Sequence, residues 1–398
     1  MRSRWIIISI VLSISTVSSW AEEVPATGTI LSWQKNFVRS SLGAKLEIIK
    51  DASKSQQVTD FGPLFDQALD FATDNYELLS DDPLTPDLVA FAADGLAKTT
   101  HTTSISKLWR AFMSWREANV RVPVLRALSV LGRGDGQVIE NLNQYLATQN
   151  SVFGSGMAPD LETLAASIEA LGRLNSASSF SVLFSTMVAG YPADIQEKAS
   201  KAIRLLDGDY RKNLIGVIRR NPPVEKLAAF REGTENPETD PDLGGEMAEV
   251  ALEVSLQIIE KGDEPEDAIK TLRRLAVREL THKRWSRATP LLIRHFHLVQ
   301  SPQEGQELDR DSVIDAIKAL GVMGDSRAAQ VLSLYLGLLN SEMERSKTWD
   351  DRILPATIEA LGDLGDKMAF DYLLYTGYLP YPDDIKALAR AALNRLKW

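Results

Sequence analysis

The strongest constraint on the fold of this chain is a stretch of sequence that occurs twice. The segment that starts at Glu169 and the segment that starts at Glu359 align without a gap, at an offset of 190 positions (359 − 169). Both begin with Glu-Ala-Leu-Gly, and both continue to a Tyr-Pro-x-Asp-Ile motif, at Tyr191 and Tyr381. Two motifs conserved at one spacing do not arise by chance, so the chain contains an internal repeat.

Shorter matches extend this repeat in both directions. The motif Leu-x-x-Tyr-Leu around Tyr145 reappears around Tyr335 at the same offset. Further upstream, Leu-x-Arg-x-Phe occurs around Arg110 and again around Arg294, at an offset of 184 (294 − 110). Small differences in loop length explain such a change of offset, so we predict two homologous halves.

The segments between these motifs have the apolar spacing of helices. Apolar residues recur three or four positions apart, as at Ile314, Ile317 and Leu320, and no segment shows sustained period-two alternation. Each segment is short and ends at Gly, Pro, Asp or Ser. A single pair of such helices is too short to be stable alone, so each pair must bury its apolar side against the next pair. The predicted fold class is therefore all-α.

The turns between these helices also recur. Ala-Leu-Gly-x-x-Gly-Asp or a close variant occurs around Gly132, Gly172, Gly321 and Gly362. Together with the segment 312–337, these turns resemble the HEAT-like repeat family. The resemblance implies an α-solenoid, a superhelical array of helix pairs, that acts as a non-enzymatic scaffold and binds a protein or other macromolecule along its concave face.

The first residues have a different pattern. A basic start at Arg2 and Arg4 precedes an uncharged apolar run, and a small-x-small site ends at Ala21. This pattern is typical of a secretory signal peptide with cleavage after Ala21, and it predicts a periplasmic or secreted bacterial protein. A retained membrane anchor is the alternative. The mature chain has no other apolar run long enough to span a membrane.

Composition excludes several classes of function. The chain of 398 residues has a formal net charge of −10 and no cysteine. Disulfides, thiolate metal sites and a cysteine nucleophile are therefore excluded, and the acidic balance argues against nucleic-acid binding. No nucleophile elbow, phosphate loop or His-Glu-x-x-His motif is present, so we assign no catalytic residue and no cofactor.

The predicted organisation combines these observations. In chain order it comprises a signal peptide over 1–21, an N-terminal cap segment over 22–59, a first HEAT-like half over 60–220, an acidic linker rich in Pro and Gly over 221–244, and a second half over 245–398. The linker is predicted because acidic residues, Pro and Gly dominate its second part.

Four histidines occur in the sequence, and two of them lie close together. His295 and His297 are two positions apart on a predicted helix, so their side chains point in different directions and one metal ion cannot bind both. We therefore assign no metal site.

One segment of this acidic chain is strongly basic. Lysine and arginine dominate residues 270–287, and we select Arg273, Arg274, Arg278 and Arg284 as candidate binding residues. Two alternatives stay open. The basic residues could form a solvated face that neutralises acidic residues of the same molecule, or they could bind an anionic cell-envelope polymer.

Aromatic residues provide the second set of candidates. Tyr145, Tyr335, Tyr372 and Tyr375 lie on or next to the second helices of their pairs, which line the concave side of HEAT arrays. Aromatic residues often dominate binding at protein interfaces, so these tyrosines are candidates for contact with a protein partner. Burial in the core is the alternative. The oligomeric state is left open.

Overall fold

The computed structural model describes residues 26–235, 241–261, 266–300 and 308–397. Within these ranges the chain forms α-helices joined by short turns, five of which are 3₁₀ turns, and no β-strand. The prediction of an all-α fold is therefore confirmed. The predicted signal peptide and its cleavage site at Ala21 lie outside the described residues.

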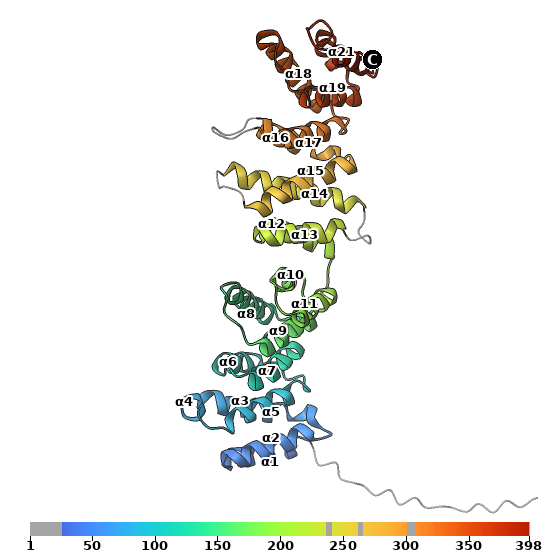
Figure 1. Cartoon of the computed structure of the whole chain (residues 1–398). Coiled ribbons are helices and arrows are strands. Elements are labelled where there is room, and N and C mark those ends of the chain that lie inside the picture. Colours follow the sequence, from blue (N-terminus) through green and yellow to red (C-terminus); the bar gives the residue numbers. More distant parts are fainter. Residues whose placement is uncertain (1–25, 236–240, 262–265, 301–307, 398) are drawn as a thin grey trace, which may run out of the picture. The chain divides into compact units, whose positions relative to one another are not determined.

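The helices follow one another closely along the chain (Figure 1). Their bounds are α1 Ala26–Arg39, α2 Leu42–Lys54, α3 Gly62–Asp74, α4 Tyr76–Leu79, α5 Thr85–Leu96, α6 Ile105–Ser114, α7 Ala118–Leu131, α8 Gly136–Gly154, α9 Leu161–Leu174, α10 Phe180–Val188, α11 Ala193–Leu205, α12 Tyr210–Arg220, α13 Pro223–Glu235, α14 Pro241–Glu260, α15 Asp267–Lys283, α16 Thr289–Gln300, α17 Arg310–Gly321, α18 Ser326–Ser346, α19 Ile353–Leu364, α20 Phe370–Thr376 and α21 Asp383–Leu393.

The chain divides into two compact units, and in each of them helices contact near neighbours in the sequence. The first unit comprises 1–142 and 159–174. Here α2, α5, α7 and α9 pack in succession, and α1, α3 and α6 form a second row. The second unit comprises 143–158 and 175–398. Here α13, α15, α17, α19 and α21 form one row, and α12, α14, α16, α18 and α20 form the other. Contacts of this local kind are typical of helical-repeat proteins.

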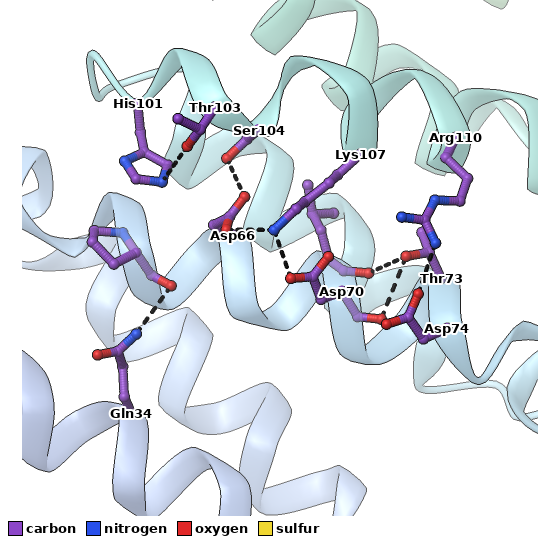
Figure 2. Close-up of polar contacts among 12 residues, drawn as sticks. Gln34, Asp66, Asp70, Thr73, Asp74, His101, Thr103, Ser104, Lys107 and Arg110 are labelled. Atoms are coloured by element: carbon purple, nitrogen blue, oxygen red, sulfur yellow. Dashed lines mark hydrogen bonds and ion pairs between the residues drawn. The ribbon is translucent and has the colours of Figure 1, made fainter.

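Charged side chains join adjacent helices of one row in the first unit. Lys107 of α6 contacts Asp66 and Asp70 of α3, with Nζ to carboxylate distances of 2.6 Å in both cases. The hydroxyl of Ser104 donates to Asp66, and Arg110 pairs with Asp74 (Figure 2). Because both carboxylates share one ammonium group and Asp66 also accepts from a hydroxyl, this cluster is satisfied internally.

The same contacts occur in both copies of the repeated sequence, segments 143–206 and 333–396, which we name the first and second copy, and the residues that form these contacts belong to the second unit. The Tyr191 hydroxyl donates to the carbonyl oxygen of Gln149, and the Tyr381 hydroxyl donates to that of Leu339. Both tyrosine side chains are buried. Each pair of partners is related to the other by the sequence offset of 190, so the repeat extends to tertiary contacts.

A side-chain amide contact is repeated in the same way. In the first copy the Asn150 side chain bonds to the hydroxyl of Thr186, at 3.0 Å. In the second copy the Asn340 side chain bonds to the hydroxyl of Thr376, at 3.2 Å. A buried polar group that lacks a partner destabilises the fold, so the threonine contributes most at Asn340, which is fully buried.

The prediction of a linker over 221–244 is wrong for its described residues. Helix α13 covers Pro223–Glu235, and α14 begins at Pro241. Ala229 and Phe230 are buried, and the Lys226 ammonium donates to the carbonyl oxygen of Ile218. The acidic composition concealed a helix because the acids follow its short apolar stripe, and Pro is tolerated in the first turn.

Candidate functional site

Two of the predicted tyrosines, Tyr372 and Tyr375, lie on α20, which packs against α18. Leu334 and Leu338 are four residues apart on α18, so they share one side of this helix, and Leu338 is 64% exposed. The ring of Tyr372 packs over Gly337, where any Cβ would approach it to 2.9 Å. This contact places Tyr372 of α20 against α18 at Gly337, the residue before Leu338.

Large exposed residues also occur on α20 and in the turn after it. Tyr375 is 41% exposed, and its hydroxyl donates to the Glu344 carboxylate, which raises the Tyr375 pKa. Leu374, the residue before Tyr375, is also exposed, and Tyr378 is 77% exposed. We name Leu334, Leu338, Leu374, Tyr375 and Tyr378 the α18–α20 face. Neighbouring exposed residues of this size mark interaction sites more often than isolated ones do.

The corresponding helix of the first copy is covered. Helix α10 packs against α12 and α13, and Phe180 of α10 contacts the ring of Tyr210. Ser185, which stands where the second copy has Tyr375, donates to Glu225 of α13 at 2.6 Å. Phe184, at the position of Leu374, is fully buried. In the second copy α20 packs against α18, α21 and the 3₁₀ turn Lys367–Ala369, and its equivalent side is exposed.

The remaining positions also differ between the copies. Gln144 and Thr148 of α8 occupy the positions of Leu334 and Leu338. The fold of the repeat therefore tolerates polar residues here, and burial in the core does not account for the two leucines.

The other two predicted tyrosines have internal contacts. Tyr335 is half-buried and its ring contacts the edge of Phe296, with centroids 5.1 Å apart. Desolvation raises its pKa. Tyr145 is half-buried near Tyr191, whose pKa is raised to about 12 by burial. Tyr145 and Tyr335 therefore lie mainly within the packing, which is the alternative that the sequence left open.

Most basic residues near α15 have acidic partners in the same molecule. Arg278 lies 3.6 Å from Asp315, and Lys283 lies 3.9 Å from Glu279. Past the end of this helix, Arg287 pairs with Glu249. Arg284 ends the helix in a left-handed conformation, with φ 48°. These pairs favour the interpretation of a face that neutralises acidic residues nearby.

Two of the selected arginines, Arg273 and Arg274, line a cavity of about 330 Å³ between α15, α16 and α17. His295 of α16 and Asp309 at the start of α17 also line it. His295 is 3% exposed, whereas His297 is exposed and contacts Gln300, so the two imidazoles point apart as predicted. The place of His295 beside Arg273 has no signal in the sequence, because nothing in the local pattern relates positions on adjacent helices.

The described residues contain no group of three or more His, Cys, Asp or Glu side chains placed to hold a metal ion. Over the same residues, no helix combines the length and apolar character that crossing a bilayer requires.

Comparison with solved structures gives similarities, of which the one described here is of low strength. No protein-family model matches the chain, and no curated protein matches it. The chain is similar to an engineered protein whose crystal structure was determined by the Northeast Structural Genomics Consortium, with 13% identity and a TM-score of 0.34. The alignment covers 92% of this chain and 98% of the engineered protein. Similarity at this level gives no argument about function.

Proposed function

We propose that this protein is a non-enzymatic scaffold that binds a partner protein through the α18–α20 face. The observation that supports this proposal is the difference between the two copies. Their interiors share the same tyrosine and asparagine contacts, but only the second copy exposes large apolar residues on this side. Since the shared fold does not require these residues, another role must account for them.

The first copy indicates the chemistry of the partner. The equivalent side of α10 is covered by two helices, α12 and α13, which supply apolar contacts and side-chain hydrogen bonds. The partner segment that suits the α18–α20 face is therefore an amphipathic helical pair. Asp371, which occupies the position of Ser181, is exposed. Ser181 contacts Asn221 of α12–α13, so a hydrogen-bond donor or a basic residue opposite Asp371 would complete the match.

Site-specific crosslinking tests the proposal. A photoreactive amino acid at position 338 or 378 of the full-length chain should crosslink to one protein in an extract of the producing cells. The matched control is position 148, the equivalent of 338 in the first copy, and it should not capture that protein. The crosslinked peptide should derive from a helical segment. Equal capture from 148 and 338, or no protein captured from 338 and 378, would contradict the proposal, and a crosslink to a second copy of this chain would reassign the face to self-association.

Export from the cytoplasm is part of the proposal. It is supported by the basic start, apolar run and small-x-small site that precede residue 22. N-terminal sequencing of the protein from a bacterial host tests it. The expected first residue is Glu22, and an intact Met1 would show that the segment is retained.

A further inference from the structure

The cavity between α15, α16 and α17 has the features of a binding site. Its volume of about 330 Å³ is at the lower end of the range for small-molecule pockets. Val277, which is buried, provides an apolar wall, and Thr271 and Ser312 also line the cavity. It lies entirely within the second unit.

Some of the charged residues that line the cavity have ion-pair or hydrogen-bond partners within the protein. Lys270 is 3.6 Å from Asp267, and Asp315 is 3.6 Å from Arg278. The Asp309 carboxylate accepts hydrogen bonds from the hydroxyl and backbone amide of Ser312, which lower its pKa.

The two arginines that line the cavity differ from these residues in their lack of hydrogen-bond and ion-pair partners. In the part of the chain that the structure describes, neither Arg273 nor Arg274 forms a hydrogen bond or a close ion pair. Arg273 is half-buried, and burial lowers its pKa while the negative charge of Asp309 raises it. A guanidinium group has five N–H donors, and burial without partners is unfavourable. The cavity therefore holds unused donors.

The imidazole of His295 is the second unsatisfied group. Its Nδ1 atom is fully buried and has no hydrogen-bond partner within the described ranges. Burial, followed by the charge of Arg273, lowers the pKa of His295 to about 3, so the ring is neutral at physiological pH. A neutral imidazole adds no positive charge to the cavity wall, so the guanidinium of Arg273 is the group beside it that would attract an anion.

We infer that this cavity binds a small molecule through a single carboxylate group, which pairs with the Arg273 guanidinium next to His295. A carboxylate matches the planar fork of arginine with two parallel hydrogen bonds. A dianion such as phosphate suits the site less well, because Asp267, Asp309 and Asp315 also line it and would repel a second negative charge. This inference is independent of the proposed function, since the α18–α20 face is formed by other helices.

Nuclear magnetic resonance of the full-length chain labelled with ¹⁵N-histidine tests the inference. Only four histidines are present, and the His295 signals are assigned by their loss in His295→Gln. Benzoate should shift the His295 imidazole signals in a saturable way at neutral pH. Benzamide, which has the same shape without the charge, should not, and inorganic phosphate at equal ionic strength should have no saturable effect.

Two arginine variants locate the contact. Arg273→Lys keeps the charge but removes the fork, and it should weaken benzoate binding by about tenfold or more. Arg294→Lys alters an exposed arginine of α16 that pairs with Glu260, outside the cavity, and it should leave binding unchanged. If Arg273→Lys lowers the melting temperature, the comparison of benzoate with benzamide in the unaltered chain decides alone. The inference is overturned if benzoate gives no saturable shift, if benzamide binds equally well, if phosphate binds as tightly as benzoate, or if the two arginine variants behave alike.

Discussion

The first and second copies of the repeat share an interior and differ on one outer side. In both copies a buried tyrosine bonds to a carbonyl group 42 residues before it, and an asparagine bonds to a threonine 36 residues after it. On the outer side, α12 and α13 cover Phe184 and Ser185, whereas Leu374 and Tyr375 are exposed. Packing of the repeat thus determines the interior residues, and the neighbours of each copy determine the surface residues.

The largest expected effect comes from removing the shared tyrosines. Tyr191→Ala and Tyr381→Ala should each lower the free energy of unfolding by about 3–5 kcal/mol, because each leaves a cavity the size of an aromatic ring. Urea unfolding measures the loss. Tyr378→Ala, at a side chain that is 77% exposed, should stay within about 0.5 kcal/mol. An unchanged free energy of unfolding for either variant would show that the tyrosine contact does not stabilise both copies.

Replacement of the two repeated asparagines should lower the free energy of unfolding by different amounts. Asn340→Ala should lower the free energy of unfolding by about 1–3 kcal/mol, since Asn340 is fully buried and Thr376 loses its side-chain partner. Asn150→Ala should lower it less, because Asn150 is only half-buried and water can reach the site. Urea unfolding of both variants gives the comparison. A larger loss at Asn150 would contradict it.

Substitutions in the turn after the Glu-Ala-Leu-Gly motif should change stability by different amounts in the two copies. Gly365 and Asn175 occupy equivalent positions and both have positive φ, 67° and 55°. Gly365→Ala should destabilise the protein by about 1–2 kcal/mol, because an added Cβ is strained there and approaches the Arg395 carbonyl oxygen to 3.2 Å. Asn175→Gly should change stability by only a few tenths of a kcal/mol. Thermal unfolding distinguishes the two variants, and equal shifts in melting temperature would contradict the expected difference.

The smallest expected effect is the pH dependence of stability that Asp366 contributes. Asp366 accepts from the Met368 amide, which lowers the pKa of Asp366, and the equivalent residue of the first copy is Ser176, which does not titrate in this range. A lowered pKa means that the Asp366 contribution to stability is present above the unfolded value of about 4 and is lost as pH falls through the folded value. The difference in unfolding free energy between the protein and Asp366→Ser should therefore shrink below about pH 4. A difference independent of pH would contradict this.

The sequence predicted the helices well because its signals are local. The apolar spacing of 161–174 matches α9, and the Tyr-Pro motifs at Tyr191 and Tyr381 lie just before α11 and α21. The repeat offset also relates the 3₁₀ turns at Ala177–Ser179 and Lys367–Ala369.

Contacts between helices could not be predicted from local sequence patterns. The periodicity of α16 gives no information about its register against α15, so the approach of His295 to Arg273 could not be predicted. The same applies to the tyrosines. Tyr335 and Tyr375 have similar sequence surroundings, but only the neighbouring helix decides that Tyr335 packs on Phe296 while Tyr375 is exposed.

The most direct test exchanges the surface of the second copy for that of the first. The variant combines Leu334→Gln, Leu338→Thr and Tyr375→Ser in the full-length chain, with a photoreactive residue at 378. If the α18–α20 face binds a partner, the crosslink formed from 378 in the unaltered background should disappear, while the melting temperature stays within a few degrees. An undiminished crosslink would contradict the account, as would unfolding of the variant, because these residues would then belong to the core.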